Sequence, residues 1–341
     1  MKSTLVFLTL CLCVLVVPAQ AAKYAGEFLE IGVGAHGVGM GGAMTAHTGD
    51  ASSFYWNPAG MAYVSGLQLN GMYADLWNGL ANYSVAGITL PITGAVFSAN
   101  WVRLGVPDIQ RHPNYDDLQF PVVVGNDTAY SVQQYLMLTG AAPQGMFTDN
   151  ESAIFLTFAK QNAFTLDLGW SYFQVPIEMP IGANLKIINQ KLGSSGGSGL
   201  GADFGFQLRF PLSEVFYEKW NAKLAYGLNW QDATRTQVSW GEHNKDAFVT
   251  NFRHGLALIQ TMPGRDNELT LSWDTEKRYD RVNHYGLEYL HHQVIALRGG
   301  FWGKDWTAGA GVSFWRATVD YAYYGRELGS THRLSLNLKL K

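Results

Sequence analysis

The sequence has little charge and almost no cysteine. Charged residues make up 15% of the 341 residues, whereas a soluble globular domain carries about 25%. The formal net charge of -3 gives no reason to expect a nucleic acid as a partner. Glycine (38 residues) and aromatic side chains (13%) are abundant instead, and 47% of the residues are hydrophobic. This composition excludes a disordered chain and suits many β-strands joined by turns.

Residues 1–21 have the three parts of a secretory signal peptide. Lys2 supplies the positive charge, Leu5 to Val17 the apolar run, and Ala19-Gln20-Ala21 a small-residue exit, which predicts cleavage after Ala21. The alternative is an N-terminal membrane anchor, but the apolar run is shorter than the roughly 20 residues of a spanning helix. Both cysteines, Cys11 and Cys13, would leave with this peptide. The exported chain could then form no disulfide.

No apolar run of 18 or more residues follows the signal peptide. Instead, apolar and polar residues alternate over several segments. Leu269, Leu271 and Trp273 alternate with polar residues, as in a strand with two different faces. A β-sandwich would turn the apolar face inward, and a membrane barrel would turn it toward lipid. Here one face of the strands carries large apolar residues, and the other face carries glycine, alanine and charged residues. Trp and Tyr also recur near the ends of the strands. These features favour the barrel.

We predict an all-β fold, a 14-stranded antiparallel transmembrane β-barrel. Segment 151–159 also looks strand-like, but an even strand number is expected of such barrels. We therefore assign it to a long extracellular excursion, 104–162, within a barrel domain of residues 67–341. The predicted wall strands are 67–76, 80–90, 93–103, 163–173, 178–190, 199–210, 221–230, 252–262, 266–275, 282–290, 293–302, 305–314, 316–324 and 331–340.

Residues 22–66, ahead of the barrel, are too irregular and glycine-rich for a wall strand. They contain a formal G-x-G-x-x-G at Gly32, Gly34 and Gly37, but a dinucleotide site needs a preceding strand within a βαβ unit. Tight turns and close backbone approach explain the glycines better. The Asn57-Pro58 pair predicts a fixed turn leading toward the first strand. The residues predicted to form these turns and close contacts are Gly32, Gly34, Gly39, Gly41, Gly42, Asn57, Pro58 and Gly60.

This N-terminal segment resembles the signature of the FadL-like outer-membrane proteins, most closely their PorV/PorQ branch. The chain's last hairpin, Asp320 to Leu336, is also similar to that branch. The resemblance implies a 14-stranded barrel in the bacterial outer membrane, whose N-terminal segment, residues 22–66 with the glycines named above, folds into the lumen as a plug. The matching runs are Ile31 to Ala35, Gly39 to Ala43, Asp50 to Ser52 and Tyr55 to Gly60.

Two functions follow from the resemblance. FadL-like proteins imply passive uptake of hydrophobic ligands, and the PorV/PorQ branch implies a barrel of the type IX secretion system that binds exported proteins. The expected partners are thus outer-membrane lipid and either hydrophobic small molecules or exported proteins, with no cofactor. Candidate ligand-lining residues are the aromatics of the plug and outer loops: Phe54, Tyr55, Trp56, Tyr115, Phe120, Tyr130, Tyr135 and Phe147.

The sequence gives little support for catalysis, metal binding or a charge-selective pore. None of the nine histidines lies near a G-x-S-x-G or H-E-x-x-H motif, so we predict no enzyme and no metal site. His291-His292 is interpreted as a solvated turn, and the acids of the long excursion lack EF-hand spacing. Charges predicted to face the lumen are nearly balanced, which favours pairing with each other and with the plug over a charge-selective ring. They are Asp167, Asp203, Glu268, Asp274, Glu288, Asp320, Lys186, Arg209, Lys223, Arg298, Arg316, Arg333 and Lys339.

Overall fold

The computed structural model describes residues 26–112, 118–140, 144–167, 169, 174–213, 221–241, 244–262, 266–326 and 329–340. The predicted signal peptide, residues 1–21, and Tyr115 lie outside these ranges. Among the described residues, no helix has the length and apolar character needed to cross a bilayer.

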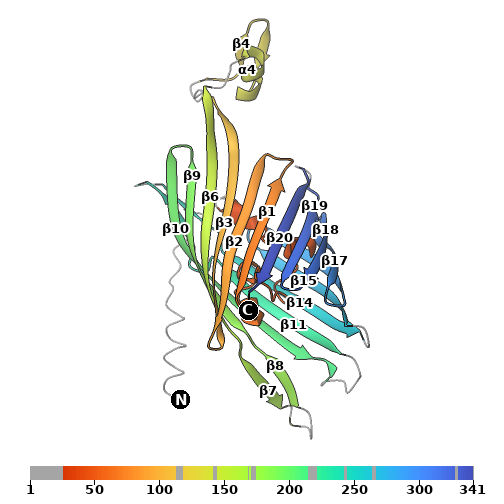
Figure 1. The fold of residues 1–341 in the computed structure, drawn as a ribbon. Helices are drawn as coiled ribbons and strands as arrows, with labels where there is room; N and C mark the ends of the chain where they lie inside the picture. The colour runs from red at the N-terminus through yellow and green to blue at the C-terminus, as the bar shows by residue number, and fades with distance from the viewer. Residues whose placement is uncertain are drawn as a thin grey trace.

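The chain forms a closed, antiparallel 14-stranded transmembrane β-barrel, which confirms the predicted fold class (Figure 1). Each wall strand pairs with its neighbours along the chain, and β1 closes the ring by pairing with β20 from Gln68↔Lys339 to Asp75↔His332. The wall strands are β1 (Gln68–Leu76), β2 (Ala81–Ile92), β3 (Ala95–Arg111), β6 (Gly145–Lys160), β9 (Ile181–Leu192), β10 (Ser195–Pro211), β11 (Ala222–Gln231), β14 (Asn251–Met262), β15 (Asn267–Lys277), β16 (Arg281–His291), β17 (Ile295–Trp302), β18 (Asp305–Phe314), β19 (Ala317–Tyr324) and β20 (Thr331–Lys339).

One wall strand is not the predicted one. Segment 151–159 belongs to β6, which pairs with β3 and β9 in the wall. Segment 163–173 is wrong as a wall strand, because β7 (Ala163–Asp167) pairs with β8 (Gln174–Glu178) as a hairpin. The excursion between β3 and β6 therefore spans 112–144, not 104–162. Asp167, predicted to face the lumen, is exposed on this hairpin.

The long connections leave the barrel at two ends. The segment 112–144 carries β4 (Val122–Val124), β5 (Asp127–Ala129) and helix α4 (Val132–Thr139), which project beyond the barrel rim (Figure 1). At the same end, β12 (Gln237–Trp240) and β13 (Asn244–Ala247) form a hairpin between β11 and β14. The β7–β8 hairpin lies at the opposite end. It makes segment 161–180 the longest connection there.

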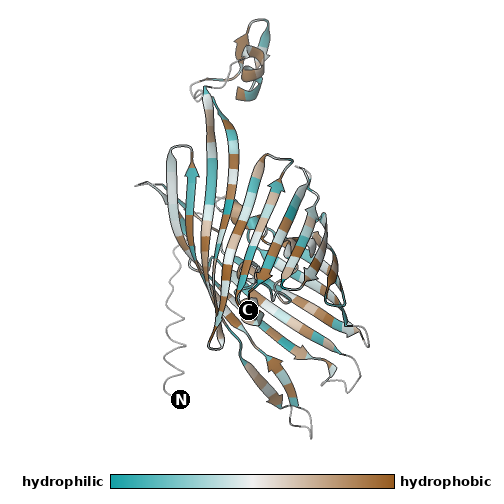
Figure 2. Cartoon of the chain, in the orientation of Figure 1, coloured by the Kyte–Doolittle hydropathy of each residue, from teal (hydrophilic) through white to brown (hydrophobic). Residues whose placement is uncertain are grey.

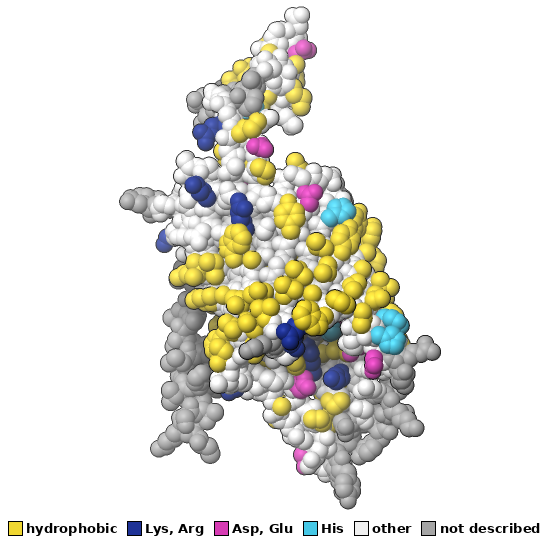
Figure 3. Space-filling model, viewed as in Figure 1, with side chains coloured by type: hydrophobic (Ala, Val, Ile, Leu, Met, Phe, Trp, Pro, Cys, Tyr) yellow, Lys and Arg dark blue, Asp and Glu magenta, His cyan; other side chains and the backbone are white. Residues whose placement is uncertain are grey.

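The two faces of the wall have opposite chemistry. Along β15, Leu271 points outward with 48% exposure, whereas Asp274 is fully buried in the lumen. Teal and brown alternate along the wall strands in Figure 2, which reflects this period of two. Figure 3 shows hydrophobic side chains gathered in a band across the barrel, with charged side chains mostly above and below it. An apolar belt around a polar interior is the pattern of a barrel that contacts lipid.

Residues 26–66, which we call the inner segment, occupy the lumen. They contain η1 (Glu27–Glu30), α2 (Ala35–Gly39), α3 (Ser53–Trp56) and η2 (Pro58–Tyr63). The segment hydrogen-bonds to inward side chains on opposite sides of the ring, including Asn184 of β9 and Thr307 of β18. The largest group of buried apolar side chains lies between this segment and the wall, with Trp56, Phe28 and Phe54 among its largest members.

Candidate functional site

Wall side chains hold the backbone of the inner segment at many points. Arg333 donates to the carbonyls of Gly32 (2.5 Å) and Ile31 (2.7 Å). Asn184 donates to Phe54 O at 2.7 Å and Asn229 to Trp56 O at 2.8 Å. Irregular backbone leaves carbonyls without secondary-structure partners, so a buried segment needs such donors. The inward polar side chains of the wall therefore serve as hydrogen-bond partners for the segment.

The Asn57-Pro58 turn lies deep in the barrel against β9 and β10. The Asn57 side chain accepts a hydrogen bond from Ala59 N and donates to Thr45 O (2.7 Å) and Phe206 O (3.1 Å). A Cβ at Gly205 would lie 2.2 Å from Asn57 Oδ1. Only a glycine at that wall position leaves room for the turn. Pro58 then begins η2, and β1 follows at Gln68.

The predicted plug glycines all lie in the inner segment, and several touch other backbone. A Cβ on Gly41 would lie 2.6 Å from Phe301 N, and a Cβ on Gly300 would lie 2.5 Å from Gly41 N. Gly41 also has φ +63°, a conformation that favours glycine. Segment and wall therefore meet backbone to backbone here. The remaining predicted glycines are equally confined, because a Cβ on any of them would lie within 3.2 Å of another atom: Gly32, Gly34, Gly39, Gly42 and Gly60.

The predicted ligand-lining aromatics divide into two separate groups. Phe54, Tyr55 and Trp56 are buried between segment and wall, and the Phe54 ring lies 5.1 Å from that of Phe155. The Tyr55 hydroxyl donates to Leu29 O and Trp56 Nε1 to Val33 O. The second group lies in segment 112–144 and at the start of β6: Phe120, Tyr130, Tyr135 and Phe147. The structure does not bring the two groups together, and none of these side chains lines either cavity described below.

Most of the charges predicted to face the lumen pair with other charges or with the inner segment. Lys186 is buried between Asp203 (2.8 Å) and Asp232. Arg298 bridges Glu288 at 2.5 Å and Asp320 at 2.6 Å. Balanced, hydrogen-bonded pairs can be buried without leaving an isolated charge. Of the other predicted charges, Lys223, Arg316 and Lys339 are exposed near the ends of their strands.

One cluster joins charges from the segment to charges from the wall. His36 Nδ1 contacts Asp50 Oδ2 at 2.7 Å, and His36 Nε2 lies 3.3 Å from Glu288 Oε2. His47 Nε2 lies 3.8 Å from Glu288 Oε1. Burial and the charge of Arg298 lower the pKa of His36, but the carboxylates of Glu288 and Asp50 outweigh them and raise the pKa to about 9. Burial raises the pKa of Asp50, but His36 and Ser52 outweigh it and lower the pKa to about 2.

Sequence reasoning missed this cluster. His36 and His47 stand eleven positions apart in an irregular run, and Glu288 follows some 240 residues later. No motif spacing links them, because the barrel closure brings β16 to the segment. The only signal in the sequence was that Glu288 falls at an inward-facing position of its alternating strand.

The outer face of the wall carries an apolar hollow of about 730 Å³, which we call the outer hollow. It lies over β11 and β14–β18. Gly299 forms part of its floor, and a Cβ there would meet no atom within 4 Å. On the inner side of the same wall, Met40 and Gly41 contact Gly286 and Gly300. The wall between the outer hollow and the inner segment is thus a single layer of backbone. Its larger lining side chains are Leu256, Leu271, Tyr285, Leu287, Phe301 and Trp306.

Comparisons with known proteins give structural likeness alone. No family model matches the sequence, and no curated protein matches it. The toluene transporter TodX of P. putida is similar with a TM-score of 0.47 and 10% identity, over 91% of this chain and 99% of that chain. The CymD monoaromatic hydrocarbon channel has a TM-score of 0.44 and 10% identity, over 90% and 96%. The translocator domain of autotransporter NalP from Neisseria meningitidis has a TM-score of 0.32 and 12% identity, over 81% and 89%.

Proposed function

We propose that this chain is a FadL-like protein of the bacterial outer membrane that takes up hydrophobic small molecules passively. The observation that carries the proposal is the outer hollow. Its volume of about 730 Å³ falls in the usual range of small-molecule sites, about 300–1,000 Å³. Its lining is apolar apart from Ser272 and Thr307, so the ligand class is a hydrocarbon or another molecule with a large apolar part.

The inner segment supports a selective route over an open pore. We propose that it acts as a plug, as its sequence resemblance implies. Its backbone is fixed by Arg333, Asn184 and Asn229 across the lumen, and buried side chains fill the space between. A ligand held in the outer hollow would face Gly299 and Gly300, where a single backbone layer separates it from Met40 and Gly41. The ligand would therefore enter or leave through this part of the wall.

Filling the outer hollow tests the proposal. Gly299→Leu places a side chain in open space, and its φ does not require glycine. We expect delipidated protein to bind a long-chain fatty acid or toluene about tenfold more weakly after this change, a loss of about 1.4 kcal/mol. Uptake of the same probe into proteoliposomes should fall in parallel.

The matched control is Leu185→Trp, which enlarges an outward side chain on β9, away from the outer hollow. It should leave both binding and uptake at the wild-type level. Equal binding by wild type and Gly299→Leu, or equal loss in both variants, would refute a ligand site in the outer hollow.

Location and processing can be measured separately. Fractionated membranes should contain the chain in the outer-membrane fraction, and its first residue should be Ala22 if the signal peptide is removed as predicted. An inner-membrane or soluble location would contradict the proposal.

A second candidate is the PorV/PorQ role, a barrel of the type IX secretion system that binds exported proteins. The observation that favours it is the projecting unit β4–β5–α4. Its apolar side chains Val123, Tyr130 and Met137 are each at least 70% exposed, and clustered exposed apolar groups commonly mark protein contacts. Replacing residues 118–140 by a short Gly-Ser linker should abolish co-purification of exported proteins with a common C-terminal domain. Retained co-purification would contradict this role, and the fatty-acid assay distinguishes it from uptake.

A further inference from the structure

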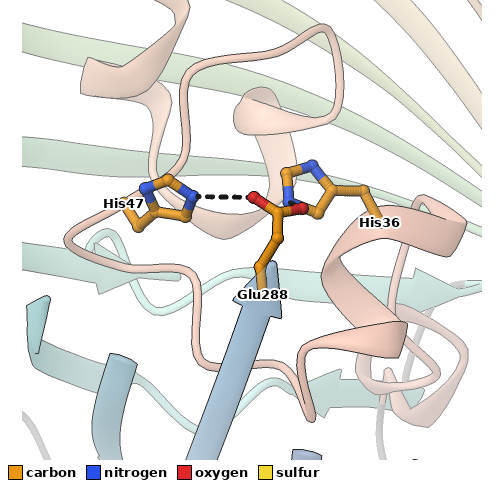
Figure 4. Close-up of side chains that lie close together, drawn as sticks. All are labelled: His36, His47 and Glu288. Atoms are coloured by element: carbon orange, nitrogen blue, oxygen red, sulfur yellow. Dashed lines mark ion pairs between the residues drawn. The ribbon is translucent and has the colours of Figure 1, made fainter. Parts of the chain in front are cut away.

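Three potential metal ligands meet where the inner segment faces β16. Figure 4 shows the Glu288 carboxylate pointing between the imidazole rings of His36 and His47. The ligand atoms of all three side chains lie within 4.8 Å of one another. His36 Nε2 is buried and lies 3.3 Å from Glu288 Oε2, an ion pair without hydrogen-bond geometry. The imidazole nitrogen therefore faces the carboxylate at a distance that leaves room for adjustment toward a shared ion.

We propose that His36, His47 and Glu288 form a Zn²⁺ site that links the inner segment to the barrel wall. Two imidazoles and one carboxylate are a donor set that zinc uses in proteins, with a fourth position left for water. Tetrahedral zinc with bonds of about 2.0–2.2 Å sets its ligand atoms roughly 3.4 Å apart. His47 Nε2 lies 3.8 Å from Glu288 Oε1, close to that spacing, and His36 Nε2 lies 3.3 Å from Oε2 of the same carboxylate.

The surroundings of His36 match those of a metal ligand. Its Nδ1 contacts Asp50 Oδ2 at 2.7 Å, which leaves Nε2 to point at Glu288. The second oxygen of Asp50 accepts hydrogen bonds from Ser52 N (2.7 Å) and Ser52 Oγ (2.6 Å). A carboxylate behind a ligating histidine fixes the ring and raises its basicity. Asp50 is therefore a positioning residue for the site.

The local charge also suits a divalent cation. Asp50, Glu288 and Asp320 carry three negative charges when ionised, and Arg298 supplies one positive charge through its pairs with Glu288 and Asp320. Once both histidines are neutral, as metal ligands must be, the group keeps two negative charges, which Zn²⁺ would balance. Arg298 Nε occupies Glu288 Oε2, so Oε1, the oxygen nearer His47, is the one available to the metal.

Space for water adjoins the cluster. A polar cavity of about 20 Å³, lined by His36, Asp50 and Asp320 among others, lies beside it. A water molecule needs about 10–15 Å³ of such volume. The side chains of His36 and His47 keep 18% and 13% exposure, so an ion can reach them from the lumen.

The test is metal binding by the full chain, refolded in detergent near neutral pH. We expect the wild type to retain one Zn²⁺ per chain after gel filtration, and to give the intense visible bands of tetrahedral Co²⁺ when cobalt is added. His36→Gln and His47→Gln should each weaken binding at least tenfold and remove the cobalt bands. Heat-modifiable migration on gels, a property of folded barrels, reports whether each variant has folded.

Two controls separate this site from other histidines. His254→Gln removes an imidazole that packs against Trp273. The double variant His291→Ala/His292→Ala removes the histidine pair at the turn between β16 and β17. Both should bind like the wild type. Asp50→Asn should keep the ligands but weaken zinc binding about 10–100-fold, and zinc should raise the unfolding temperature of the wild type but not of His47→Gln.

Several results would overturn the proposal. The first is a wild type that binds no more zinc than folded His36→Gln or His47→Gln. The second is binding lost in the His291/His292 variant and kept in His47→Gln. A third is wild-type binding of Co²⁺ without tetrahedral bands.

Discussion

The inner segment meets the wall in two different ways on two sides of the barrel. On the side of β9–β11, the amide side chains of Asn184 and Asn229 donate hydrogen bonds to backbone carbonyls of the segment, and Lys186 lies buried among carboxylates of the wall. On the side of β16–β18, glycines let the segment touch the wall backbone, and the outer hollow lies just outside. The first side, which we call the anchored side, is held by directional polar contacts. The second, the glycine side, adds direct backbone contact to polar contacts from Thr307 and Glu288. Under the proposed function it is the side where a ligand would pass.

The largest loss of folding free energy is expected when the buried ion pairs of the anchored side are removed. Lys186→Met leaves Asp203 without its buried cation, whereas Asp232 keeps Arg278 at 3.3 Å. Removing one partner of a buried pair costs about 3–5 kcal/mol. Urea unfolding of the refolded barrel should show this loss of free energy. Lys191→Met, an exposed lysine on the same strand, should change it by less than about 0.5 kcal/mol. Equal effects of the two variants would contradict a structural role for the buried pair.

The Asn57 turn should have the next largest effect. Asn57→Ala removes hydrogen bonds to Ala59 N, Thr45 O and Phe206 O, and we expect a loss of about 1–3 kcal/mol. The segment should then seat less firmly, so planar-bilayer recordings of Asn57→Ala or Pro58→Ala should show leak conductance. Asn126→Ala in the exposed β4–β5 turn should stay closed. An unchanged closed state in the Asn57 and Pro58 variants would refute the plug assignment.

Adjacent glycines on the glycine side provide a matched pair. The Cβ of Gly300→Ala would lie 2.5 Å from Gly41 N, so segment or wall must shift, at a cost of about 1–3 kcal/mol. The Cβ of Gly299→Ala would enter open space in the outer hollow, with a change below about 0.5 kcal/mol. Chemical unfolding of the two variants measures the difference. Similar stabilities would mean that the segment does not press on this wall.

The smallest effect is expected at the rim of the glycine side. Asp305 and Arg326 approach to 3.9 Å, and the Arg326 side chain is 42% exposed. Exposed pairs contribute about 0–1 kcal/mol, so Asp305→Asn should leave the unfolding midpoint almost unchanged. A loss comparable to that of Lys186→Met would show that rim charges hold the barrel as strongly as buried ones.

The two faces of the wall could be predicted from alternation, because lipid and lumen impose opposite chemistry on successive residues. The count of fourteen also needed the expectation of an even strand number. The position of one strand could not be predicted. In β6, Phe155 faces inward yet is apolar, since it packs on Phe54 of the inner segment. Both faces of 151–159 are therefore largely apolar. The segment still looks strand-like, and only the expected even number of strands assigned it to the excursion in favour of 163–173. The β7 segment alternates convincingly, but it pairs with β8 beyond the barrel wall.

The candidate sites were less accessible to sequence reasoning. The glycine-rich run indicated close packing, and the structure locates its contact partners, such as Gly300 and Gly205, on distant strands. The His36, His47 and Glu288 cluster depends on barrel closure, as does the outer hollow, whose lining comes from six strands. Contacts of this kind have no local sequence pattern.

The most direct test of the account is the lipid accessibility of β15 in a bilayer. Single cysteines at positions 269–274, in a background with Cys11 and Cys13 replaced by serine, would carry spin labels for oxygen-accessibility measurements. We predict high oxygen accessibility for labels replacing Leu269, Leu271 and Trp273, and low accessibility for those replacing Thr270, Ser272 and Asp274. An inverted pattern, or one with no alternation, would contradict a barrel whose apolar face contacts lipid and whose polar face encloses the inner segment.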